Sequence, residues 1–119
     1  MRMSATATPF DVEALIADSS LDTLTTLLAD EIHWIEVDQR SQPHAPAVYR
    51  GRDAVIAMLE GAHEHGIVSQ VVDGFSAGDR AALAVLCSYP GGGEVRCNAL
   101  LHLRDGKIVR WDGVQAWDD

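Results

Sequence analysis

A glutamate in an apolar strand is the residue of this chain best suited to acid–base chemistry. Residues 32–37 (Ile-His-Trp-Ile-Glu-Val) have the β-branched and aromatic character of a strand, and strand alternation places Trp34 and Glu36 on one face. If that face lines a cavity, as a family resemblance described below implies, the carboxylate is desolvated and its pKa rises toward the range that a general base needs. Glu36 could instead form an ion pair with Arg40 or Arg50, and the sequence leaves both roles open.

A second group of candidate residues lies near the C-terminus. Alternate residues of a strand expected over 108–117 share one face, and on it lie Trp111, Gly113, Gln115 and Trp117. A tryptophan surface beside a side-chain amide is a suitable platform for a flat organic ligand. Tryptophans of this kind also fill protein cores without any ligand. We expect Trp111 and Gln115 to line a pocket, and either role remains open for Trp117.

The polar segment 36–44 and the tyrosine that follows it are further candidates. By its composition the segment is a loop, and it could act as a lid that brings Asp38, Arg40 or His44 to the mouth of a pocket. Most loops of this kind are simply solvated. Tyr49 is a candidate for binding a ligand, where its hydroxyl would polarise a ligand oxygen.

The five histidines and the glycine-rich turn do not indicate a metal or a cofactor. His63 and His65 are two residues apart at the end of an expected helix and point in different directions, whereas zinc sites on helices use an i, i+4 pair. The triple glycine 91–93 joins two strands and is not followed by the Lys-Ser/Thr of a phosphate-binding loop. We therefore expect neither a metal nor a cofactor.

The charge balance limits the partners of this protein. Eighteen acidic and nine basic residues give a net charge of −9, and the arginines are scattered, so we expect no nucleic acid and no anionic membrane surface as partner. No apolar run approaches the roughly 20 residues that cross a bilayer, and the start does not resemble a secretory signal. These features predict a cytoplasmic protein whose partner is a small uncharged or cationic molecule.

The two cysteines are expected to be reduced thiols in such a compartment. One alternative depends on the register of a hairpin. If residues 91–93 form its loop and Pro90 faces Glu94, then Cys87 lies directly opposite Cys97. A disulfide there would be possible but strained.

Hydrophobic periodicity predicts three helices and five strands. Apolar residues recur at helical spacing from Phe10 to Ile16 and from Leu21 to Leu28, and the segment Asp18-Ser19-Ser20 supplies a stop and the N-cap of the second helix. A third helix spans 53–65, and Gly66 supplies a left-handed C-cap. A loop is expected over 39–48, and strands are expected over 32–37, 67–75, 81–89, 94–104 and 108–117.

This order of elements predicts an α+β domain. A curved antiparallel sheet wraps around three helices and leaves a cone-shaped cavity between them. Residues 9–119 form this single domain, and residues 1–8 form a flexible extension. Because residues 81–87 are apolar on both faces, the sheet face away from the helices must also be covered. We expect a second copy to cover it, giving a homodimer through the outer sheet face, with a covering loop as the alternative.

Several segments carry a family resemblance. They are residues 21–31, Trp34 in the following strand, the phrase Tyr-Arg-Gly-Arg-Asp-Ala-Val at 49–55, and Leu-Arg-Asp-Gly-Lys-Ile-Val-Arg-Trp at 103–111. Through them the chain resembles the nuclear-transport-factor-2-like superfamily, in particular its SnoaL-like branch, over nearly its whole length. That branch includes ketosteroid isomerase, limonene-epoxide hydrolase and polyketide cyclases, so the resemblance implies a fold but not a reaction.

The resemblance also implies roles for individual residues. Glu36 falls where ketosteroid isomerase keeps its general-base carboxylate. The isomerase's oxyanion-hole tyrosine falls on Val12 and its protonated aspartic acid on Ala99, and neither side chain here can donate a hydrogen bond. The essential aspartate of limonene-epoxide hydrolase corresponds to Gly113, which leaves Asp112 as a weak alternative if a bulge turns it inward.

Three functions remain open from the sequence. The first is binding of a small, largely apolar organic ligand in the cavity, without proven catalysis. The second is a cofactor-independent isomerase, lyase or cyclase with Glu36 as general base. The third is a structural dimerisation module whose own side chains fill the cavity. The departures from both enzyme patterns favour ligand binding, and the expected ligand contacts are Trp34, Tyr49, Ala99, Trp111, Gln115 and Trp117.

Overall fold

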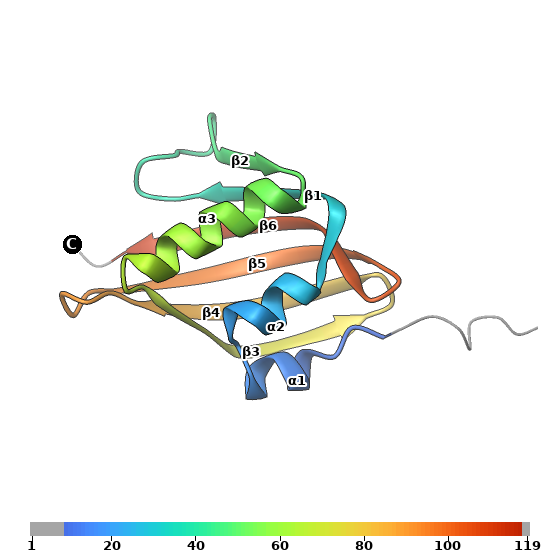
Figure 1. Ribbon diagram of the computed structural model, residues 1–119. Coiled ribbons are helices and arrows are strands. Elements are labelled where there is room, and N and C mark those ends of the chain that lie inside the picture. Colours follow the sequence, from blue (N-terminus) through green and yellow to red (C-terminus); the bar gives the residue numbers. More distant parts are fainter. Residues whose placement is uncertain (1–8, 118–119) are drawn as a thin grey trace, which may run out of the picture.

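The computed structural model describes residues 9–117, which form one sheet with helices on one of its faces (Figure 1). The sheet order is β2-β1-β6-β5-β4-β3, antiparallel except for the parallel pair β1 and β6. The expected α+β fold with a curved sheet around three helices is confirmed. Its elements in this region are α1 (Val12–Ala17), α2 (Leu21–Thr26), β1 (Leu28–Val37), β2 (Ala47–Arg50), α3 (Arg52–Glu64), β3 (Val68–Ala77), β4 (Arg80–Ser88), β5 (Glu94–Arg104) and β6 (Lys107–Trp117).

Local capping fixes the helices as the sequence predicts. The Ser20 side chain accepts a hydrogen bond from the backbone N–H of Thr23 at 3.2 Å and so begins α2. Gly66 follows α3 with a φ of +82°, and the backbone N–H of Ile67 donates to the carbonyl of Ala62 at 3.1 Å. This is the left-handed ending that glycine favours. It turns the chain from α3 directly into β3.

Two boundaries differ from the prediction. The segment expected to be a loop over 39–48 ends in strand β2, which pairs with β1 through Trp34 and Tyr49 and forms an edge of the sheet. Strand β1 begins at Leu28, a residue that the helical spacing assigned to the second helix. Leucine fits either structure, and here pairing with Ile108 of β6 prevails over the local helical pattern.

The β4–β5 hairpin has a different register from the one that would align the cysteines. Ser88 faces Glu94, and Tyr89 donates its backbone N–H to the carbonyl of Gly93 at 2.9 Å. The loop of this hairpin therefore spans residues 89–93, two more than the three glycines alone. As a result Cys87 faces Val95, and Cys97 lies two residues further along β5. Both cysteines are free, so the strained Cys87–Cys97 disulfide considered as an alternative from the sequence is not formed.

The core lies between the helices and the inner face of the sheet. Leu15, Ile32, Val55, Leu101 and Ile108 are its most completely buried large side chains. On β4, alternate residues Ala81, Leu83 and Val85 are buried in the same layer. The outer face of the sheet is different, because large apolar side chains there are exposed: Phe75, Leu100 and Val114 are 68%, 65% and 59% exposed.

Candidate functional site

The carboxylate of Glu36 is the centre of the candidate site. Glu36 is the buried charged side chain of the described region, with 7% of its surface exposed. Its Oε1 accepts hydrogen bonds from Trp34 Nε1 at 3.1 Å and from Trp111 Nε1 at 3.0 Å. Its Oε2 accepts one from Gln115 Nε2 at 3.2 Å, and the Cys97 thiol lies 3.8 Å away. A buried carboxylate with this many donors is well satisfied.

The two indoles reach the same oxygen because they are stacked. Trp34 and Trp111 are register partners on the parallel neighbours β1 and β6 and project from the same face. Their ring centroids are 4.0 Å apart and their planes differ by 5°. Glu36 lies two residues beyond Trp34 on β1, so strand alternation returns its side chain to the indole edges. Sheet pairing, rather than a loop, therefore holds the site.

A glycine makes the space that the carboxylate occupies. Gly113 faces Glu36 in the β1–β6 register. A Cβ at position 113 would lie 2.6 Å from Glu36 Oε2 and 2.7 Å from Trp111 Nε1, closer than real Cβ atoms approach other heavy atoms. Residue 113 must therefore lack a side chain for Glu36 to reach its three donors.

Gln115 is held in one orientation by a third tryptophan. Trp117 donates its Nε1–H to Gln115 Oε1 at 2.9 Å, which directs the amide N–H₂ of Gln115 toward Glu36. The Tyr89 and Trp117 rings are in tilted contact with centroids 5.4 Å apart. Trp117 itself is 37% exposed, so its role is to position the amide from the rim.

Burial dominates the protonation of this site. Desolvation raises the pKa of Glu36, hydrogen bonds from Gln115, Trp111 and Trp34 oppose that rise, and the charge of Asp38 adds to it. Burial likewise raises the pKa of the Cys97 and Cys87 thiols, so both stay protonated at neutral pH. The two cysteines act as soft apolar groups rather than as nucleophiles.

A cavity of about 160 Å³ adjoins the Glu36 cluster. Its walls come from α1, α2, α3 and the inner face of the sheet, and the donors to Glu36 form one side of it. None of the side chains around it is charged. The lining residues are Leu15, Ser19, Leu24, Trp34, Met58, Leu59, Ala62, Ile67, Ser69, Val71, Val85, Cys87, Tyr89, Cys97, Trp111 and Gln115.

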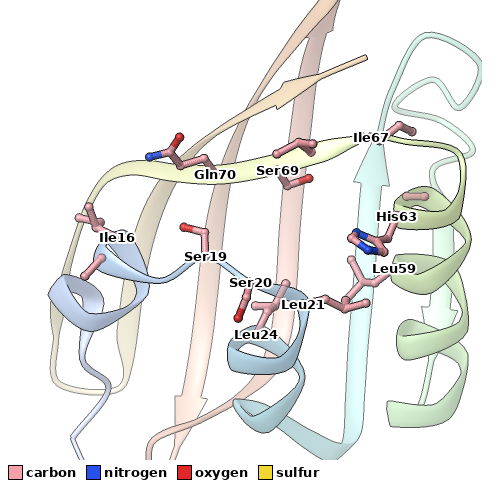
Figure 2. A pocket seen from close by; sticks show the side chains of 13 residues that line it. Ile16, Ser19, Ser20, Leu21, Leu24, Leu59, His63, Ile67, Ser69 and Gln70 are labelled. Atoms are coloured by element: carbon pink, nitrogen blue, oxygen red, sulfur yellow. The ribbon is translucent and has the colours of Figure 1, made fainter. Parts of the chain in front are cut away.

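A cleft of about 400 Å³ lies next to this cavity. Figure 2 shows it between the α1–α2 segment and α3, with the start of β3 along one side. His63 and Leu59 project into it from α3, opposite Leu24 of α2. The cleft and the cavity share the lining residues Ser19, Leu24, Leu59, Ala62, Ile67 and Ser69. The two spaces are therefore neighbours that share one wall.

The structure brings only some of the sequence-predicted site residues together at Glu36. Trp34, Trp111 and Gln115 meet at Glu36 and also line the cavity. Tyr49 is half-buried on β2 beside Trp34, and Ala99 is buried on β5 beside Gly113; the lining of the cavity includes neither.

Asp112 lies away from this cluster. Its carboxylate accepts a hydrogen bond from Arg110 Nε at 2.7 Å, and it borders a groove on the outer face of the sheet. The irregularity in the β5–β6 ladder falls between His102 and Leu103, so it does not turn Asp112 inward. In the lid segment, Asp38 accepts hydrogen bonds from the backbone N–H groups of Arg40 and Ser41, which shapes the turn itself.

Sequence reasoning missed part of the cavity wall. Tyr89 directly follows β4 and Cys97 lies on β5, and neither side chain gave a signal in the sequence beyond apolar alternation. Cys97 could have been found from the sheet register, because it faces Gln115 across β5 and β6. The α3 residues Met58, Leu59 and Ala62 belong to an apolar stripe that predicted burial but not a cavity.

Residues 9–117 contain neither a cluster of metal-binding side chains nor a helix that could cross a membrane. In this range no three His, Cys, Asp or Glu side chains are grouped so that they could hold a metal ion. Among the helices of the same range, none has the length and apolarity to span a membrane.

Replacing Gly113 should disrupt the site directly. We expect Gly113→Ala to displace Glu36 or Trp111 and to lower the free energy of unfolding by about 1–3 kcal/mol, the usual cost of overpacking a buried site. The near-ultraviolet circular dichroism of the stacked indoles should weaken as well. Urea unfolding and near-ultraviolet spectra measure both effects. Gly93→Ala, where the added Cβ meets no atom within 4 Å, is the matched control; equal stability of the two variants would contradict this account.

The pKa of Glu36 predicts a pH dependence of stability. A folded-state pKa above the ordinary value of 4.5 means that Glu36 stabilises the fold most below that pH, and that this contribution is lost as pH rises through the raised pKa. The free energy of unfolding should therefore fall across that window in the wild type but not in Glu36→Gln. Urea titrations at a series of pH values test this, with the exposed Glu60→Gln as control. Parallel pH curves for wild type and Glu36→Gln would refute it.

Comparisons with known proteins agree with the fold. The family model described as a SnoaL-like domain matches residues 12–111. A nuclear-transport-factor-2-like protein of unknown function from Mesorhizobium loti is 24% identical, with a TM-score of 0.68 over 88% of this chain and 84% of that one. A protein from Catenulispora acidiphila with a ketosteroid isomerase-like fold, solved in complex with trimethylamine, is 20% identical, with a TM-score of 0.63 over 89% and 85%.

A nuclear-transport-factor-2-like protein of unknown function from Cytophaga hutchinsonii is 18% identical, with a TM-score of 0.63 over 87% of this chain and 96% of that one. A comparison with curated proteins finds no match. At these identities the solved structures support the fold alone, whereas the family model spans most of the chain. The chain belongs to the SnoaL-like domain family.

Proposed function

We propose that this domain binds a small, largely apolar organic ligand in the cavity beside Glu36. The observation that carries the proposal is a cavity of about 160 Å³ whose lining is mostly aliphatic, aromatic and sulfur-containing, with Gln115 and two indole edges at one side. Ligand sites typically combine an apolar wall with a few fixed polar groups in this way. The complex of the Catenulispora acidiphila protein with trimethylamine supports the capacity of this fold to hold a small molecule.

The cleft between α2 and α3 supports a route of entry. It is open to solvent and shares six lining residues with the cavity. Ala62 and Leu59 of α3 line both spaces, as Leu24 does, so a ligand that enters from the cleft would pass between them. Small shifts of α2, a helix of six residues with no buried side chain, would widen this passage.

The geometry favours binding over proton transfer by Glu36. A carboxylate has about four lone-pair directions. Three of them accept hydrogen bonds from Trp34, Trp111 and Gln115, and the Cys97 thiol donates weakly to Oε2 at 3.8 Å. Glu36 is also absent from the cavity lining, because its donors stand between it and the cavity. A general base must reach the proton that it removes, so Glu36 would first have to release a donor. Its fixed, fully hydrogen-bonded state is better suited to a constant electrostatic role.

We propose in addition that the outer face of the sheet pairs with a second copy. Phe75, Leu100 and Val114 are exposed on adjacent parts of that face, around a groove that also includes Ala82 and Ala84. Exposed apolar side chains gathered on one sheet face are typical of an interface. A twofold contact of this face with itself would bury all of them at once.

Filling the junction between cleft and cavity should prevent ligand entry. Ala62→Leu places a larger side chain where the cleft meets the cavity, so we expect bound small molecules to be lost while the fold is kept. Native mass spectrometry of freshly purified protein and changes of the Trp34 and Trp111 indole N–H resonances in NMR measure occupancy. Ala57→Leu, at an exposed position of the same helix, is the matched control. Unchanged occupancy in Ala62→Leu, or a wild type that binds no apolar probe, would contradict the proposal.

A charge on the outer sheet face should break the dimer. We expect Leu100→Asp to shift the protein from dimer to monomer, because a carboxylate in an apolar contact loses its hydration without a partner. Sedimentation equilibrium measures the change. Ala57→Asp adds the same charge on the helical side and should leave the dimer intact. A wild type that stays monomeric at high concentration would overturn this interface.

A further inference from the structure

The cavity combines an uncharged wall with a buried carboxylate directly behind it. Its sixteen lining residues include no Asp, Glu, Lys, Arg or His. Glu36 contacts the cavity only through Trp34, Trp111, Gln115 and Cys97, all of which line it. A negative charge on Glu36 therefore acts electrostatically on a ligand in the cavity, because little water lies between the carboxylate and the cavity to screen it.

The hydrogen bonds match the ionised form of this carboxylate. An indole N–H can only donate, so the two bonds to Oε1 leave it no acceptor for a carboxyl proton. Oε2 faces the N–H₂ of Gln115, whose own oxygen is already occupied by Trp117. Only the Cys97 sulfur, 3.8 Å from Oε2, is placed to accept a proton from Glu36, and sulfur is a weak acceptor, whereas the anion accepts hydrogen bonds from all of the donors.

This negative charge has no positive partner in the described part of the chain. The ion pairs found across residues 9–117 join Arg80 to Asp79, Arg104 to Glu31 and Arg110 to Asp112, and none includes Glu36. The charge that acts on Glu36 most directly is that of Asp38, which is also negative. A buried charge without a counter-ion is costly, and a bound cation would remove that cost.

The aromatic groups around the cavity also favour positive charge. Trp34, Trp111 and Tyr89 all line it, and aromatic π-systems attract cations in sites from which water is excluded. Because both indole N–H groups donate to an anion, electron density moves into the rings and strengthens this attraction.

The cavity has few free acceptors for N–H groups of a ligand. Ser19 Oγ donates to the Leu15 carbonyl at 2.8 Å and accepts from the Val71 N–H at 2.9 Å. Ser69 Oγ is paired with the Cys87 thiol at 3.3 Å. A primary ammonium needs three acceptors, whereas a tertiary ammonium needs one and a quaternary ammonium none.

We propose that the ligand of this cavity is a small organic cation, a tertiary or quaternary ammonium with apolar substituents. This inference rests on the proposed ligand-binding function and names its ligand class. Glu36 is the buried counter-ion of the cation, acting through Trp34 and Trp111 rather than by contact. The net charge of −9 also favours the approach of a cation to the cleft.

Three probes of nearly the same shape and different charge test this inference. They are choline, its neutral carbon isostere 3,3-dimethylbutan-1-ol, and the anion 3,3-dimethylbutanoate. All three tryptophans of the chain belong to the Glu36 cluster, so intrinsic fluorescence and the indole N–H resonances report directly on the site. At neutral pH we expect choline to bind about tenfold tighter than the neutral isostere. The anion should bind more weakly than both.

A pair of variants separates Glu36 from general attraction to an acidic protein. Glu36→Gln should bring the affinities of choline and the neutral isostere close together, whereas the exposed Glu60→Gln makes the same change in net charge and should leave their ratio unchanged. The preference for choline in the wild type should also persist at high salt, because a buried charge is screened weakly.

The outcomes distinguish this inference from the proposed function. If the neutral isostere binds in the cavity as tightly as choline, the cationic ligand is refuted while ligand binding stands. If none of the three probes nor any apolar molecule perturbs the Trp34 and Trp111 resonances, both proposals fail. Because the three probes are compared on the wild type, the test does not depend on whether Glu36→Gln folds.

Discussion

The candidate site depends on one interaction, the acceptance of two indole N–H groups by a single buried carboxylate oxygen. Trp34 and Trp111 can meet at Glu36 Oε1 only because β1 and β6 are parallel neighbours in register, which stacks the two rings and directs their N–H edges the same way. An antiparallel pairing would reverse one strand and separate those edges. The parallel pair β1 and β6 in an otherwise antiparallel sheet is therefore the topological origin of the site.

The energy balance at Glu36 explains why the surroundings are so specific. Taking a carboxylate out of water costs several kcal/mol, and the hydrogen bonds that it accepts offset only part of this cost. The raised pKa of Glu36 reflects what remains uncompensated. A structure that served stability alone would be better with an apolar residue at this position. Retaining the charge at the end of a cavity is consistent with a role in binding.

The sequence predicted the layers of this protein better than the contacts inside them. Helical spacing, the Ser20 cap and the left-handed turn at Gly66 are local signals, and the structure confirms each of them. Strand alternation also put Trp34 and Glu36 on one face, which the structure shows to be buried. The sequence prediction missed the short strand β2, because that strand depends on pairing with β1. The register considered for the β4–β5 hairpin was wrong, because backbone hydrogen bonds in the turn set it. Alternation of apolar residues encodes neither of these.

The same limit applies to the site. The sequence placed Trp111, Gly113 and Gln115 on one face. Comparison with limonene-epoxide hydrolase suggested only that Gly113 replaces an aspartate. The structure shows that the space is occupied, because the carboxylate of Glu36 reaches it from the neighbouring strand. An aspartate at 113 and the glutamate at 36 could not both fit, and their charges would repel each other at that distance. There is therefore room for one acid beside this end of the cavity. In this protein the acid is Glu36 of β1, which lies behind the two indoles. From there its charge can act on a ligand electrostatically, without contact.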